Sequence, residues 1–469
     1  MSELKEKLSK LISPENVSDN EALRAQKAVD LYALRMYQQN IGWKPTLPQL
    51  VVTPETTQQV ADVLSYLNEE NIKVVPRGGG SGVLAGAEVR DEEVVVLDVS
   101  KLTSIGEIND ESLYITCGAG VYLKDLEKHL NERGYKTGHY PQSFDLAQMG
   151  GLVSTNSIGQ FSSYYGGIEN LLLGMKAVNV DGTIVEIKPN PRKATGPDLR
   201  HIYMGGEGAF GIVTEVTIKI FPMPEETWMQ AYRVEDMDVG LEIIRKIIRD
   251  GAQPPVVRLH DWLECEKPYG QYMEEDECML LFLTEGSTEK VAADRAIIEK
   301  YAGKEAIASA GEKPVEHWLI HRNDAEEEYE EYGKQGLLVD TIEISATWSD
   351  IHKIYNETVD KIYMDIPEIL YASAHSSHSY MNGTNLYFMF GAMPGSDIDT
   401  AEKLHKAIWD VVMEVTVKYN GAIAHHHGIG KHRVPYLRNE LGNGVEVLKA
   451  MKDALDPKHI LNPGSLIAE

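Results

Sequence analysis

Three consecutive histidines near the end of the chain are the residues best suited to proton transfer. His425, His426 and His427 stand directly before Gly428. An imidazole titrates near neutral pH, so it can accept or donate a substrate proton. Three rings in a row before a glycine turn cannot all share one environment. The pattern favours a proton-transfer site, and a solvated histidine cluster is the alternative interpretation.

Two arginines and a tyrosine offer groups that could bind a substrate. Arg258 lies in a short apolar run that predicts an inward-facing strand, where a buried charge requires a ligand or a carboxylate partner. Arg322 offers a second guanidinium, whose planar fork suits a carboxylate or a phosphate. The phenol of Tyr387 could donate to a substrate oxygen, although a strand tyrosine with an outward-pointing ring explains it as well.

A glycine-rich loop follows a predicted strand at residues 73–76. Residues 76–82 read Pro-Arg-Gly-Gly-Gly-Ser-Gly, and such a loop lets backbone N–H groups close on a diphosphate because no Cβ blocks the approach. The loop is neither the dinucleotide fingerprint nor a P-loop. Taken alone, it is explained equally well as a flexible turn.

Three later segments favour cofactor binding. They are residues 141–151, residues 157–167 and residues 205–214, each rich in glycine. Together with the glycine loop they resemble the FAD-binding domain of the vanillyl-alcohol oxidase and p-cresol methylhydroxylase superfamily, over nearly the whole chain. Residues 193–201 and 424–433 narrow the resemblance to the alkyldihydroxyacetonephosphate synthase branch, and within it to bacterial FAD-containing dehydrogenases similar to D-lactate and glycolate dehydrogenases.

The resemblance implies a non-covalent FAD. Some relatives attach FAD through His or Cys, but neither residue occurs in residues 77–82 or beside Tyr165, and Cys117 falls at a predicted strand end. The positions that the resemblance assigns to FAD binding are Pro76, Arg77, Gly78, Gly79, Gly80, Ser81, Gly82, Pro141, Ser143, Met149, Gly150, Gly151, Ser154, Ser157, Gly159, Tyr165, Gly166, Glu207, Gly208, Gly211, Ile212 and Asn462.

The resemblance also implies catalytic roles. It places His426 and His427 beside the flavin, matches Tyr387 to an active-site tyrosine, and matches Arg258 and Arg322 to arginines near an anionic substrate.

Metal binding is a further possibility that the histidines raise. Imidazole ligands could come from His375, His378, His426 and His432. Similar metal-dependent 2-hydroxy-acid dehydrogenases carry an acidic residue where His426 stands and a histidine where Tyr387 stands. No metal is therefore expected, and whether one binds near His375, His378 and His426 stays open.

Three functions are compatible with these residues. The first is oxidation of a small polar 2-hydroxy acid by hydride transfer to flavin N5, with electrons passed to an electron-transferring flavoprotein or a similar acceptor. The second is the redox-neutral exchange catalysed by an alkylglycerone-phosphate synthase. The short polar segment at residues 264–278, where the lipid synthase carries a long insertion, favours the first. A non-enzymatic flavin-binding module is the third.

The elements that must position these residues predict an α+β fold. We expect two helices within residues 1–45, a two-part FAD-binding domain at 46–224 with a βαβ beginning, and a substrate domain at 225–405 built on a helix-covered antiparallel sheet. Residues 406–469 then return to the flavin with the histidine turn. The acidic run at residues 326–331 predicts one face of a solvated helix.

Charge and cysteine content limit the expected binding partners and cellular compartment. Lys and Arg number 45 against 72 Asp and Glu, and the net charge of −27 disfavours nucleic acid and anionic membrane surfaces as partners. Three cysteines without a CxxC pair are typical of a reducing compartment. With a charged N-terminus and no apolar run long enough to span a bilayer, the sequence predicts a cytoplasmic protein without membrane insertion, and a homodimer is expected.

Overall fold

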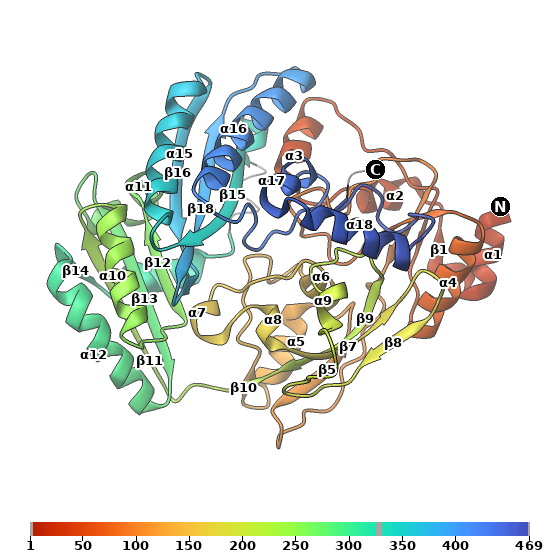
Figure 1. The fold of residues 1–469 in the computed structure, drawn as a ribbon, viewed down its shortest axis with the longest axis horizontal. Helices are drawn as coiled ribbons and strands as arrows, with labels where there is room; N and C mark the ends of the chain where they lie inside the picture. The colour runs from red at the N-terminus through yellow and green to blue at the C-terminus, as the bar shows by residue number, and fades with distance from the viewer. Residues whose placement is uncertain (1–2, 325–330, 468–469) are drawn as a thin grey trace.

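A computed structural model describes residues 3–324 and 331–467. The chain forms two halves, each built on its own β-sheets, with the C-terminal segment packed between and against them (Figure 1). Most of the acidic run at 326–331 lies outside the described residues. The predicted α+β fold is confirmed.

The N-terminal segment contains three helices where two were predicted. They are α1 (Glu3–Leu11), α2 (Glu21–Lys27) and α3 (Ala33–Asn40). The extra break lies between α2 and α3, at residues 28–32. There the backbone pairs with distant residues instead of continuing the helix, since the Leu31 N–H donates to the Gly82 carbonyl at 2.8 Å and the Ala28 carbonyl accepts from the Val89 N–H at 2.8 Å. The short strand β1 (Val17–Ser18) pairs with β2 between α1 and α2, and Asn20 caps α2 by accepting a hydrogen bond from the Leu23 N–H.

The first half begins with a four-stranded sheet in the order β1-β2-β4-β3. Strands β2 (Leu50–Val52) and β3 (Lys73–Arg77) both run parallel to the buried β4 (Val94–Asp98), and α4 (Thr57–Glu69) makes the crossover. This is the predicted βαβ unit. The glycine loop therefore leaves the carboxyl end of β3, the edge at which parallel sheets bind ligands.

A second four-stranded sheet completes the first half. It is antiparallel, in the order β5 (Tyr114–Gly118), β9 (Ile212–Lys219), β7 (Leu172–Val178) and β8 (Ile184–Ile187). Helices α5 (Leu123–Asn131), α6 (Met149–Ser154), α7 (Ser162–Tyr165), α8 (Ile168–Leu171) and α9 (Arg200–Tyr203) join the strands. A two-stranded ribbon of β6 (Tyr135–Lys136) and β10 (Phe221–Pro222) leads to the second half.

The second half is a large antiparallel sheet. Its order is β14 (Ala308–Gly311), β11 (Glu226–Val234), β13 (Cys278–Gly286), β12 (Val256–His260), β16 (Ile369–Ser376), β18 (Gly383–Ala392) and β15 (Leu338–Thr347), with β17 (Ser379–Tyr380) paired to β18. Four amphipathic helices pack their apolar stripes on the outer face: α10 (Met237–Arg249), α12 (Thr288–Glu305), α15 (Ile351–Asp365) and α16 (Ile398–Lys418). Helices α11 (Trp262–Tyr269) and α13 (Lys313–His321) contribute residues to the lining of the large cavity described below.

The C-terminal segment ties the two halves together. After α16 the backbone of the histidine turn is bound by Glu343 on β15, and α17 (Leu437–Leu441) and α18 (Gly444–Leu455) follow. The chain then returns to β3, where the Val74 N–H donates to the Ile460 carbonyl at 2.7 Å and the Asn462 N–H donates to the Val74 carbonyl at 2.8 Å.

A buried ion pair crosses the junction between the halves. Lys136 on β6 lies 2.5 Å from Glu285 on β13, and both side chains are almost fully buried. The Tyr165 hydroxyl donates to the same carboxylate at 2.6 Å, and the rings of Tyr140 and Phe161 surround the ammonium group. Removing one partner of such a pair leaves an uncompensated buried charge.

We therefore expect Lys136→Met to lower the free energy of unfolding by about 3 kcal/mol, because Glu285 is left without its cation. Urea titration measures this. The matched control is Lys246→Met, which breaks an exposed pair with Glu305 and should cost less than about 1 kcal/mol. Equal effects from the two substitutions would contradict a stabilising role for the buried pair.

Candidate active site

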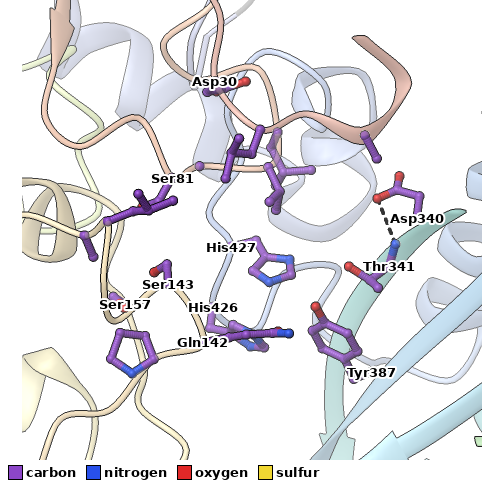
Figure 2. A pocket seen from close by; sticks show the side chains of 18 of the residues that line it. Asp30, Ser81, Gln142, Ser143, Ser157, Asp340, Thr341, Tyr387, His426 and His427 are labelled. Carbon is purple, nitrogen blue, oxygen red and sulfur yellow. Dashed lines mark hydrogen bonds between the residues drawn. The ribbon is translucent and has the colours of Figure 1, made fainter. Parts of the chain in front are cut away.

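One large cavity of about 1340 Å³ runs from the glycine loop to the histidine turn, between the two halves. Figure 2 shows Ser81, Ser143 and Ser157 on one side of it and Tyr387 on the other, with His427 between them. The cavity brings together segments that are hundreds of residues apart in the chain.

The glycine loop needs its glycines for two physical reasons. A Cβ on Gly79 would lie 1.9 Å from the carbonyl oxygen of Leu146, so that position allows no side chain. Gly80 has φ +74°, in the left-handed region that side chains rarely adopt. The Arg77 guanidinium turns away to donate to the Lys27 and Val29 carbonyls, which fastens the loop to the N-terminal segment.

Most positions predicted to bind a cofactor line this cavity. They are Pro76, Arg77, Gly78, Gly79, Gly80, Ser81, Gly82, Pro141, Ser143, Gly150, Gly151, Ser154, Ser157, Glu207, Gly208, Ile212 and Asn462. The structure places Met149, Gly159, Tyr165, Gly166 and Gly211 behind the wall instead. Met149 is fully buried in the core. A Cβ on Gly159 would lie 2.5 Å from the Tyr140 nitrogen, so the backbone packs tightly there. These two residues support the segments that line the cavity without lining it themselves.

Glu207 joins the cofactor half to the histidine turn. Its carboxylate accepts hydrogen bonds from the N–H groups of Ile429 at 2.6 Å and Gly430 at 2.8 Å, and from the Ser465 hydroxyl at 2.9 Å. Asn462 donates to the Glu207 carbonyl at 2.7 Å. Burial raises the pKa of Glu207, and these donors oppose that rise. The backbone after the turn is thereby fixed against the first half.

A fully buried carboxylate organises the histidine turn itself. Glu343, on β15, accepts hydrogen bonds from the backbone N–H groups of His426 at 3.2 Å and His427 at 2.8 Å, and its Oε2 lies 2.9 Å from His427 Nδ1. The Arg433 guanidinium donates to both of its oxygens. Burial alone would raise the pKa of Glu343, but Arg433 and His427 hold it well below its usual range.

Tyr387 stands opposite Glu343 in the sheet register and lies between two imidazoles. Its ring stacks on His375 at 4.8 Å and on His426 at 5.8 Å, centroid to centroid. Burial raises the pKa of Tyr387, so the phenol stays protonated at neutral pH and is a hydrogen-bond donor to the cavity. The interpretation as an outward-pointing strand tyrosine is therefore wrong.

Arg258 is held by two histidines from β12 and β16. Its Nε donates to His260 Nε2 at 3.2 Å, and an Nη lies 3.0 Å from His375 Nε2. A guanidinium can only donate, so both Nε2 atoms must accept and both rings must carry their proton on Nδ1. Glu264 meets those protons, since its carboxylate lies 2.8 Å from His375 Nδ1 and 3.0 Å from His260 Nδ1.

Arg322 provides a second buried guanidinium in the same wall. It lies over the rings of Phe161 at 5.2 Å, Tyr140 at 5.4 Å and Trp318 at 5.7 Å. Burial lowers its pKa, and Arg258 acts in the same direction. Within residues 3–324 and 331–467, its buried Nη1 has no hydrogen-bond partner.

The histidines considered as metal ligands divide into separate groups. Nitrogen atoms of His378, His425 and His426 lie within 4.8 Å of one another, as do ligand atoms of His260, Glu264 and His375. His432 lies apart, with its Nδ1 2.8 Å from the Tyr32 hydroxyl. The protons that Arg258 imposes on His260 and His375 assign the second group to hydrogen bonding.

Four residues of the site were missed by the sequence interpretation: His260, Glu264, Glu343 and Arg433. A signal existed for three of them. His260 and Glu264 are four residues apart, and Glu343 is a charge within an apolar strand. Arg433 lies within the segment that carried the family resemblance, but its neighbours do not reveal its partner.

Comparison with known proteins agrees with this geometry. Residues 48–188 match the model described as FAD binding domain, and residues 223–466 match the model described as FAD linked oxidases, C-terminal domain. The chain belongs to the FAD-linked oxidase family. The family is one of oxidoreductases, its members bind FAD, and the predicted resemblance is confirmed.

Similarity to individual proteins extends over the full chain. The uncharacterised FAD-linked oxidoreductase YgcU of Escherichia coli O157:H7 is 38% identical, covering 98% of this chain and 97% of its own. The glycolate oxidase subunit GlcD of Bacillus subtilis is 26% identical, covering 100% and 97%. A solved alkyldihydroxyacetonephosphate synthase shares the fold, with a TM-score of 0.83 at 22% identity over 98% of this chain and 84% of that one.

The residues present fit FAD. The cavity is long enough to connect the glycine loop with the histidine turn, and the loop glycines leave backbone exposed along it. Cys117, Cys265 and Cys278 are all buried away from the cavity wall, which agrees with non-covalent binding. Across the described ranges, no helix combines the length and the apolar character needed to cross a membrane.

The buried pair of Glu343 and Arg433 gives a pH-dependent prediction. Because the folded state depresses the pKa of Glu343, its charge stabilises the fold above the unfolded value near about 4.3, and that stability is lost as the pH falls through the lower folded value. Glu343→Gln should therefore cost about 3 kcal/mol at neutral pH, a deficit that narrows below about pH 4. Thermal unfolding across this range measures it.

Glu446→Gln is the control for that experiment, since Glu446 makes an exposed pair with Arg438. Because an exposed ion pair contributes little, this variant should unfold as the wild type does at every pH. A deficit for Glu343→Gln that stayed constant down to acid pH would contradict a depressed pKa.

Proposed function

We propose that this chain oxidises a small 2-hydroxy acid of the D-lactate or glycolate kind. The observation that carries the proposal is Arg258, a guanidinium buried in the same cavity as the histidine turn and hydrogen-bonded, among the described residues, to imidazoles rather than to a carboxylate. A buried cation arranged in this way favours an anionic ligand.

The side chains divide the chemistry between them. Bound FAD would supply the hydride acceptor. Arg258 and Arg322 bind the substrate carboxylate, and Tyr387 donates to the substrate hydroxyl and orients it. The hydroxyl proton passes to His426 Nε2, which has no hydrogen-bond partner among the described residues. His427 Nδ1 lies 2.9 Å from Glu343, which orients this second ring in the cavity.

The acceptor of the electrons is proposed to be an electron-transferring flavoprotein or a similar redox partner. The net charge of −27 suits docking to a complementary basic surface.

A redox-neutral synthase is the second candidate. It is supported by the two guanidiniums, Arg258 and Arg322, that share the ring of Trp318 at 5.0 and 5.7 Å, an arrangement that also suits a phosphate. A synthase would need a segment here that covers an alkyl chain. In this chain the segment is the short helix α11, and its Glu264 binds the histidines that contact Arg258. A small polar substrate is therefore favoured.

The deciding experiment is anaerobic titration of the purified flavoprotein while its visible spectrum is recorded. D- and L-lactate, glycolate, glycerate and 2-hydroxyglutarate are added separately. Bleaching by one of these acids, with a preference for one stereoisomer where there are two, supports the proposal. No bleaching by any of them, together with turnover of an acyl-glycerone phosphate, would replace the dehydrogenase with the synthase.

Glu264→Gln tests the binding role of Arg258. The substitution removes the negative charge behind the two rings and turns one acceptor oxygen into an NH2 donor, so the Nδ1 protons are held less firmly and the guanidinium loses its fixed orientation. We expect KM for the acid to rise by roughly tenfold or more with a smaller change in kcat. Glu274→Gln, at an exposed position, should leave both unchanged. A loss confined to kcat would contradict the binding role.

A further inference from the structure

A continuous path of hydrogen bonds leads from His426 to the protein surface. His426 Nδ1 lies 2.8 Å from His425 Nδ1, and His425 Nε2 lies 2.7 Å from the Tyr380 hydroxyl. Tyr380, on β17, is 36% exposed. Each contact is within the range for direct proton transfer between hydrogen-bonded groups.

We propose that His425 and Tyr380 form a proton relay that carries the substrate's hydroxyl proton from His426 to solvent. The relay rests on the proposed function, because it needs a reaction that delivers a proton to His426. His425 and Tyr380 act through His426, do not line the cavity, and are positioning residues in this sense.

Neighbouring groups hold the relay in line. The His425 ring stacks on His378 at 5.0 Å, and His378 Nδ1 is fixed by the Ser162 hydroxyl at 2.7 Å. The indole N–H of Trp348 donates to the Tyr380 carbonyl at 3.2 Å, which anchors the backbone at the outer end. Neither ring of the relay depends on a single contact for its position.

The electrostatics explain why His426 needs an outlet. Burial, with His427 and His425 nearby, holds the pKa of His426 well below its usual value. Burial and Arg258 likewise depress the pKa of the adjacent His378. Because His425 Nδ1 lies 2.8 Å from His426 Nδ1, the ring can accept a proton on Nε2 while its Nδ1 proton passes to His425, and no charged imidazolium has to form in this buried cluster.

The protons balance along the path. The substrate O–H bond breaks and an N–H bond forms at His426 Nε2, while the proton on His426 Nδ1 moves to His425 Nδ1. The proton on His425 Nε2 moves to the Tyr380 oxygen, and the phenol proton goes to water. One proton enters and one leaves, and no ring acquires a lasting charge. When product leaves and water refills the cavity, His426 Nε2 gives its proton to that water while a proton from solvent returns through Tyr380 and His425 to His426 Nδ1, and the starting tautomers are restored.

The first test needs no substrate. In the FAD-loaded protein with isotope-labelled histidine, nitrogen NMR reports which ring nitrogens carry protons, and His425→Gln assigns the signals. We expect one proton shared between the two Nδ1 atoms and a shift of the His425 Nε2 signal in Tyr380→Phe. Signals of His425 that do not change in Tyr380→Phe would overturn the relay, whatever the substrate proves to be.

The second test measures flavin reduction by the substrate in stopped flow. Tyr380→Phe should slow reduction by roughly tenfold, less than loss of a general base, raise the solvent deuterium isotope effect, and respond to added imidazole, which replaces the lost acceptor. Tyr419→Phe, which removes a hydroxyl bound to Glu357 far from the cavity, is the matched control and should behave as wild type. An unchanged rate and isotope effect in Tyr380→Phe would also overturn the relay.

The two tests separate the failure of the relay from that of the proposed function. Absence of bleaching by any hydroxy acid in the wild-type protein rejects the dehydrogenase, and the NMR result still decides whether the hydrogen-bonded path exists. Bleaching with normal kinetics in Tyr380→Phe keeps the dehydrogenase and rejects the relay.

Discussion

The carboxylate of Glu343 is the group on which the catalytic end of the cavity depends. It is fully buried on β15, and it binds Arg433, His427 and the backbone of the histidine turn at once. A charge in such a place is tolerated because the guanidinium meets both oxygens and the backbone N–H groups take the remaining lone pairs. The turn is therefore attached to the large sheet rather than to solvent, and Tyr387 faces it from the neighbouring strand.

The same principle operates at Arg258, farther along the same sheet, with the charges arranged differently. Arg258 is buried beside two imidazoles that accept its protons, and its nearest carboxylate, Glu264, meets the far side of those rings. The positive charge is thus oriented without being neutralised by direct contact. Glu343 positions the turn that carries the proposed proton-accepting histidines. Glu264 positions His260 and His375, which orient Arg258. The cofactor half supplies the other side of the cavity, in which both groups of residues can act on one ligand.

Much of the architecture could be predicted from residue patterns. The strands at β2, β3, β4 and β9 and the helices α4, α10 and α18 follow apolar periodicities and punctuating prolines or glycines. The break between α2 and α3 could not be predicted, because it depends on backbone hydrogen bonds from Leu31 to Gly82 and from Val89 to Ala28, which join residues distant in the sequence. The glycine loop was recognisable, but the clash that forbids a side chain at Gly79 comes from Leu146, distant in sequence.

By itself, the sequence determined the family, the cofactor class and the chemical groups available for catalysis, because these depend on residue types and local spacing. Which groups meet was decided by the tertiary structure. Glu343 pairs with Arg433, Glu264 is shared by His260 and His375, and His425 connects His426 to Tyr380, all through strand register and chain return. The physical reason is that hydrogen bonds and buried charges require contact within about 3 Å, and contacts between distant segments are set by packing of the whole fold.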